Sequence, residues 1–209
     1  MARKSSYVSP STVRGTSAFL GLVGIVAAVV GTLYAINGAT QAGAAVEVAV
    51  ELRGTDALAG AAAGLPYGAR LLTGDGIGTV LSSWDSTVAE QLLSRGDAAV
   101  LGLAVGLGAW LLGPVLESIA AGRPFGGRNA RRLAWLAVVV AVAGSVGPLL
   151  PQFGALAVLD RLGLVGPESP FVVGATFSFL PFVVGGLLLV LAEAFRQGER
   201  IDSDVEGLV

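Results

Sequence analysis

The chain has 209 residues, of which 54% are hydrophobic and only 13% are charged, and its formal net charge is −2. Soluble domains carry about 25% charged residues, so this composition excludes an ordinary water-soluble protein. The sequence also has no histidine and no cysteine. This excludes haem ligation, thiolate chemistry, Ser-His or Cys-His nucleophile pairs, the usual zinc sites and disulfides. We therefore expect a non-enzymatic protein with no metal or other cofactor.

Four apolar stretches without a charged side chain divide the chain, at residues 17–36, 98–116, 133–150 and 171–192. A helix of about 20 residues crosses the ~30 Å hydrocarbon layer of a bilayer. The pattern predicts an all-α membrane protein, a four-transmembrane-helix bundle in a single membrane domain 1–209, with helices at about 17–36, 98–116, 133–150 and 171–195. A cleaved signal peptide over the first stretch is the alternative, but a signal's apolar core usually has only 7–15 residues.

The connection 37–97 between the first two helices is the one long polar segment. Val46–Arg53 alternates apolar and charged residues, which predicts a strand with one buried face. Ile77–Leu81 is a weaker candidate for a second strand, and Asp85 or Ser86 is a candidate cap for a short helix that leads into the second span. The sequence thus predicts a small strand-containing loop, which is either a sensory cap or a structural cover.

Small residues in the second span predict close helix packing. Gly102 and Gly106 form a Gly-x-x-x-Gly pair, and Gly113 follows on nearly the same face. Pro114 and Pro181 lie within the second and fourth predicted helices, where proline removes a backbone hydrogen bond. The simplest interpretation is a compact bundle, while pairing of two copies of the chain as a homo-oligomer stays open.

Basic residues are concentrated in the segments that would lie on one side of the membrane. Three lie in the N-terminal segment, four in the connection 117–132 and two in the tail 196–209, which together are nine of the thirteen in the chain. The connections 37–97 and 151–170 instead carry most of the acids. By the positive-inside rule, both termini and 117–132 are cytoplasmic, and 37–97 and 151–170 are extracytoplasmic. We expect a multi-pass protein of a cell membrane, with the lipid bilayer as its first partner.

The predicted spans contain no ionisable residue at their centres. Their hydroxyl side chains are Ser17, Thr32, Ser145, Thr176 and Ser178. Coupled transporters and ion pathways usually place Asp, Glu, Lys or Arg near the bilayer midplane. A small-molecule or ion permease is therefore the weaker interpretation, and a structural subunit of a larger membrane complex is a further one.

The cytoplasmic connection and the end of the fourth helix carry the most specific sequence. Asn129 suits the N-cap of the third helix. Arg131 and Arg132 would then lie in its first turn, where anionic headgroups favour them. Spacing puts Glu193 and Arg196 on adjacent turns of the fourth helix, and Gly198 is a candidate for its end. These charges either pair loop with tail or receive a partner protein.

The run Gly122-Arg123-Pro124-Phe125 with Asn129, Arg132 and Leu133, and the chain end Leu191-Ala-Glu193-Ala-Phe195-Arg196-Gln-Gly198, carry a family likeness. They resemble the DUF2975 family of small bacterial four-helix membrane proteins, which share the four-span layout and a large first outer loop. The last residues depart from the family's Leu-Thr-Val ending, because this chain ends Gly207-Leu208-Val209. Members are often encoded beside a small helix-turn-helix regulator. The resemblance implies a membrane protein that controls or anchors such a regulator.

The resemblance thus implies a regulatory membrane protein, and the clustering of specific residues leads us to expect that it acts through its cytoplasmic rim. The candidate partner-binding residues of that rim are Arg123, Phe125, Arg128, Asn129, Arg131, Arg132, Glu193, Phe195 and Arg196. Direct nucleic-acid binding is not expected, because one short loop with four basic residues carries no recognition-helix pattern.

Overall fold

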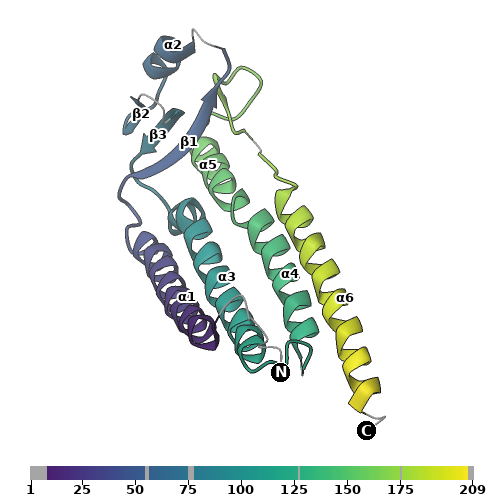
Figure 1. Cartoon of the computed structure of the whole chain (residues 1–209). Coiled ribbons are helices and arrows are strands. Elements are labelled where there is room, and N and C mark those ends of the chain that lie inside the picture. Colours follow the sequence, from purple (N-terminus) through teal and green to yellow (C-terminus); the bar gives the residue numbers. More distant parts are fainter. Residues whose placement is uncertain (1–8, 55–56, 75–77, 127, 175, 207–209) are drawn as a thin grey trace. The chain divides into compact units, whose positions relative to one another are not determined.

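The computed structural model describes residues 9–54, 57–74, 78–126, 128–174 and 176–206 (Figure 1). Its elements are α1 (Pro10–Ala39), β1 (Val46–Leu52), α2 (Ala57–Ala63), β2 (Ala69–Gly74), β3 (Gly78–Ser83), α3 (Val88–Ala120), α4 (Asn129–Val146), α5 (Leu149–Arg161), β4 (Phe171–Val172) and α6 (Leu180–Glu206). The predicted fold class is confirmed, since four long apolar helices accompany a small antiparallel sheet whose first three strands lie between α1 and α3.

The long helices leave most of their apolar surface uncovered. Four helical stretches in the described residues are long and apolar enough to cross a membrane: α1, α3, α4 with α5, and α6. In the most apolar window of each, only 11–33% of residues are buried. Phe19 is 65% exposed and Leu187 is 66% exposed. Soluble monomers rarely expose apolar patches of this size, so the chain is a multi-pass membrane protein.

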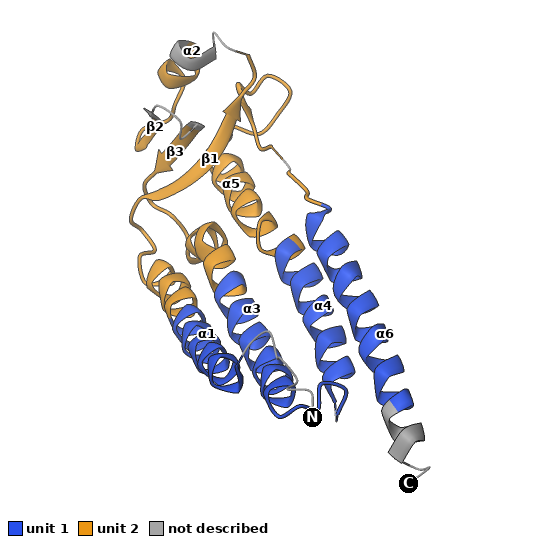
Figure 2. Ribbon diagram, in the orientation of Figure 1, with its two compact units in different colours: residues 1–29, 101–144, 179–209 blue, residues 30–100, 145–178 orange. Residues whose placement is uncertain are grey.

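The chain divides into two compact units (Figure 2). Unit 1 contains residues 1–29, 101–144 and 179–209, and unit 2 contains residues 30–100 and 145–178. The long helices α1 and α3 each contribute residues to both units.

Unit 2 is built on a four-stranded antiparallel sheet with the order β2-β3-β1-β4. The predicted alternation in β1 is confirmed, because Val46, Val48 and Val50 are buried while the residues between them are exposed. These valines pack with Leu81 of β3 and Val158 of α5 in one apolar core. The sheet therefore shares its core with α5, the last part of the third apolar stretch, since so short a loop without disulfides rarely supplies its own core.

The segment after the third predicted span differs from expectation. The third helix was predicted to end at residue 150 with a loop over 151–170, but the chain forms a second helix, α5, over Leu149–Arg161. Pro148 separates α4 from α5, because its ring nitrogen cannot donate the backbone hydrogen bond that would continue α4.

The start of the fourth helix was also predicted wrongly. Phe171 and Val172 were assigned to the span, but they form β4 and pair with Leu52 and Glu51 of β1. The Phe171 side chain is buried in the core of unit 2, so its hydrophobicity reflects a sheet core and not a lipid face. The helix α6 starts at Leu180, which places Pro181 in its first turn, where proline is tolerated.

The sequence-predicted cap of the helix leading into the second span was one or two residues too early. Thr87 Oγ1 accepts a hydrogen bond from the Glu90 backbone N–H at 3.2 Å, and Glu90 Oε2 accepts one from the Thr87 N–H at 2.9 Å. This reciprocal pair is a capping box. It starts α3 at Val88, ten residues before the predicted span. Of the weaker strand candidate, Ile77 lies outside the described residues, while Gly78–Leu81 is part of β3.

Candidate functional site

The connection between α3 and α4 is held against α6 in unit 1 by two aromatic rings. Phe125 and Phe195 meet edge to face, with ring centroids 5.6 Å apart. Gly198 lies one turn beyond Phe195, and a Cβ atom built on it would overlap the Phe125 ring. The prediction that Gly198 ends the helix is wrong, because α6 continues to Glu206. Glycine is required here by the close approach of the ring, not by a turn.

Asn129 ties the same connection to α3. Its side chain is buried, and Nδ2 donates to Ser118 Oγ at 2.5 Å and to the Pro124 carbonyl at 2.9 Å. Its Oδ1 accepts a hydrogen bond from Arg132 Nη1 at 3.3 Å. The N-cap prediction was off by one position, because Asn129 is the first residue of α4. Its amide crosslinks the loop, which fixes the direction in which α4 leaves it.

Three of the four arginines between residues 123 and 132 are exposed. Arg123, Arg128 and Arg131 present their side chains at the surface, while Arg132 is partly buried. In the described part of the chain, none of these four has a carboxylate within ion-pair distance. Their positive charge is therefore available to a ligand or partner.

The predicted pair in α6 is formed within the helix itself. Arg196 Nε and Nη2 donate to the two carboxylate oxygens of Glu193 at 2.8 and 2.9 Å. Both side chains are about half exposed, so the pair contributes little to stability. The acidic side chains of Asp202, Asp204 and Glu206 lie outside the described residues.

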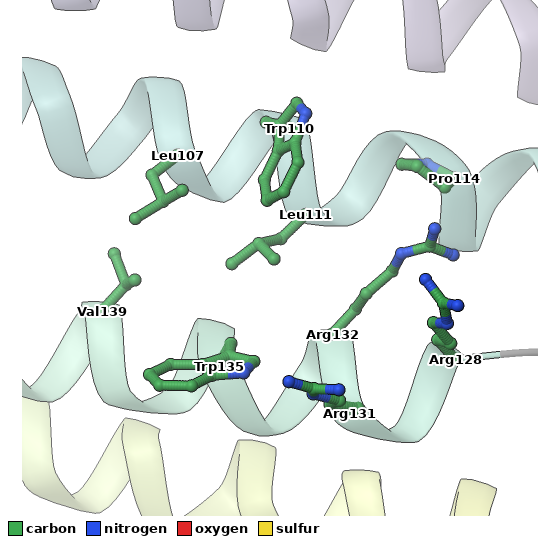
Figure 3. Close-up of a pocket in the computed structure, with 9 residues that line it drawn as sticks. All are labelled: Leu107, Trp110, Leu111, Pro114, Arg128, Arg131, Arg132, Trp135 and Val139. Carbon is green, nitrogen blue, oxygen red and sulfur yellow. The ribbon is translucent and has the colours of Figure 1, made fainter.

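A cavity of about 510 Å³ lies between α3 and α4 (Figure 3). Its lining residues are Leu107, Trp110, Leu111, Pro114, Arg128, Arg131, Arg132, Trp135 and Val139. Arg128 and Arg132 extend toward the part of α3 that carries Pro114, and the two tryptophans lie on the facing helices (Figure 3). The three arginines were predicted from the sequence as binding residues, but the two tryptophans were not. The spacing of Arg131 and Trp135, four residues apart and so on one helix face, is the signal that would have found Trp135.

Two of the predicted packing glycines on α3, Gly106 and Gly113, lie against α1. A Cβ on Gly106 would be 3.0 Å from the Ala28 Cβ and 3.1 Å from the Gly24 carbonyl oxygen. Farther along, Ser17 Oγ donates to the Gly113 carbonyl at 3.4 Å. Gly102 is buried. Close backbone approach of α1 and α3 therefore depends on small residues on both helices.

The nine predicted rim residues all belong to unit 1, and they come from the α3–α4 connection, the first turn of α4 and the middle of α6. No family model, curated protein or solved structure matches the chain.

Proposed function

We propose that the chain is a non-enzymatic regulatory protein of a bacterial cell membrane that binds a cytoplasmic helix-turn-helix transcription regulator at this end of unit 1. The observation that carries the proposal is the Phe125–Phe195 contact, because it joins the loop and α6 into one ordered surface. An ordered surface loses less conformational entropy on binding than a free loop and a free tail would. Such an arrangement suits protein docking.

The charge of this surface defines the partner's chemistry. Arg123 and Arg131 are exposed and have no ion-pair partner among the described residues. A partner should therefore bring acidic side chains, and such complementary charges favour fast and specific association. The positive-inside rule places these arginines in the cytoplasm, where a DNA-binding protein would meet them. The resemblance to the DUF2975 family supplies the regulator as the candidate.

Sequestration is the mode of control that we propose for this protein. A regulator held on the membrane is removed from its operator, and release returns it. The sheet of unit 2 belongs to the extracytoplasmic segment in the proposed orientation, so it is the part of the chain that would meet an envelope signal.

The test is purification of the full-length protein from its native membrane in a mild detergent, followed by identification of copurifying proteins. We expect recovery of a helix-turn-helix protein, and its loss in the Arg123→Gln/Arg196→Gln variant. Arg70→Gln is the matched control, because Arg70 is exposed on β2 of unit 2. Equal recovery of the regulator from all three proteins would contradict this docking surface. Absence of a regulator together with substrate flux in proteoliposomes would contradict the proposed function and favour a permease.

A further inference from the structure

The cavity between α3 and α4 has a basic end and an apolar end. On α4, the arginines at 128, 131 and 132 precede Trp135 and Val139. At a rise of 1.5 Å per residue, Val139 lies about 12 Å along the helix from Arg131. On α3, which runs in the opposite direction, Pro114 lies near the arginines and Leu107 lies deeper (Figure 3). Positive charge is thus followed by a strip of apolar side chains along both helices.

The basic end is lined by three guanidinium groups that form no ion pair with the residues that the structure describes. Arg128, Arg131 and Arg132 all line the cavity, and no carboxylate of the described residues lies within ion-pair distance of any of them. Like charges repel, and the positive end of the α4 dipole disfavours cations in its first turn. A bound anion would relieve both effects. Guanidinium groups bind phosphate oxygens through paired hydrogen bonds, so phosphate is a well-matched anion for this end.

The apolar end is suited to an acyl chain. Leu107, Trp110 and Trp135 are 44%, 71% and 52% exposed, although they belong to helices that are apolar enough to span a membrane. Tryptophan side chains concentrate at the level of the lipid headgroups. A free phosphate ion would contact only the basic end, whereas a phospholipid would contact both ends.

We propose that this cavity binds an anionic phospholipid, with its phosphate held by Arg128, Arg131 and Arg132 and an acyl chain lying along Leu107, Leu111 and Val139. Basic pockets between transmembrane helices on the cytoplasmic side bind anionic headgroups in this manner. The site shares Arg128, Arg131 and Arg132 with the partner surface proposed above, which also includes the Phe125 loop and α6.

Tryptophan fluorescence can report lipid binding at this site. It contains three tryptophans, and two of them line the cavity. In a Trp84→Phe background, all tryptophan fluorescence arises from Trp110 and Trp135. The full-length protein is placed in nanodiscs of phosphatidylcholine that contain a small fraction of lipid with brominated acyl chains, which quench nearby tryptophans. Brominated phosphatidylglycerol is compared with brominated phosphatidylcholine at the same fraction.

We expect stronger quenching by the brominated phosphatidylglycerol. Each arginine-to-glutamine substitution at 128, 131 or 132 should lower the preference about fivefold, and the triple variant should abolish it. An Arg14→Gln/Arg70→Gln/Arg123→Gln variant loses the same charge outside the cavity and should keep the preference. Circular dichroism in the same nanodiscs establishes that each variant is folded, and the single variants provide the test if the triple one is not.

Three results would overturn the proposal. Equal quenching by the two brominated lipids in the parent protein means that the cavity does not select anionic lipid. A preference that survives in the single and triple cavity variants means that other residues create it. Loss of the preference in excess inorganic phosphate, but not in an equal ionic strength of chloride, means that the site takes free phosphate.

Discussion

Glu90 and Arg161 form an ion pair between the first turn of α3 and the last turn of α5, with Nε and Oε1 2.8 Å apart. The Glu90 side chain is only 3% exposed, whereas that of Arg161 is 27% exposed. The second oxygen of the same carboxylate caps α3 through the Thr87 N–H. Arg161 also donates from Nη2 to Ser83 Oγ at the end of β3. One carboxylate therefore joins the start of α3 to the helix and sheet that form the core of unit 2.

Loss of this carboxylate should destabilise unit 2. We expect Glu90→Ala to lower the free energy of unfolding by about 3 kcal/mol, because it removes the cap and leaves Arg161 without its partner. Glu90→Gln retains an oxygen for the Thr87 N–H, so its cost should be about half as large. Chemical unfolding in detergent micelles, followed by circular dichroism, measures both. Glu47→Ala, on the exposed face of β1, should change stability by less than about 0.5 kcal/mol. Equal effects at positions 47 and 90 would refute this role.

The sequence was sufficient to predict the membrane class and β1, because apolar length and strict alternation are local signals. It was insufficient for α5 and β4. Phe171 is as hydrophobic as a lipid-facing residue, and only its pairing with Leu52, far away in the chain, shows that it belongs to a sheet. The first turn of α3 was missed for a different reason. Thr87 and Glu90 form a recognisable capping box, but the neighbouring Asp85 and Ser86 are equally good caps by residue type.

The candidate site shows the same division. The sequence was sufficient to locate the arginines in and beside one connection. It was insufficient to predict the contact between the rings of Phe125 and Phe195, which lie 70 positions apart in the chain. Gly198 was interpreted as a helix end because glycine commonly follows a last turn. Its actual reason, the space taken by the Phe125 ring, is a tertiary contact that no local pattern contains.

The contact of α1 with α3 should tolerate no side chain at Gly24. A Cβ there would lie 2.5 Å from the Ala109 Cβ and 3.3 Å from the Gly106 Cα. Gly24→Leu should therefore separate the helices and lower stability by about 1–3 kcal/mol. A Cβ on Gly21 of the same helix would meet nothing within 4 Å, so Gly21→Leu is the matched control. Thermal unfolding in detergent compares the two, and equal melting temperatures would exclude this contact as a determinant.

The connection between α3 and α4 should open locally when the Phe125 ring is displaced from its contact with α6. Gly198→Val puts side-chain atoms where the ring lies, and we expect trypsin to cleave after Arg128 several-fold faster in membrane vesicles, because cleavage requires a locally opened chain. Gly186→Val is the control, since a Cβ there meets nothing within 4 Å. Phe125→Ala removes the ring itself and should accelerate cleavage equally. Unchanged cleavage in both site variants would show that the aromatic contact does not hold the loop.

The orientation proposed for the chain can be tested without first removing any cysteine, because the natural sequence contains none. Tyr67 is fully exposed in unit 2 and Arg123 is exposed in unit 1, so a single cysteine at either position is accessible to a maleimide. By the positive-inside rule, Tyr67→Cys should react with a membrane-impermeant maleimide in intact cells, and Arg123→Cys only after the membrane is opened. Val29→Cys, in the apolar part of α1, should react slowly in both preparations because a thiol in hydrocarbon rarely ionises. The reverse labelling of positions 67 and 123 would invert the topology and place the arginine end of unit 1 outside the cell, beyond the reach of a cytoplasmic regulator.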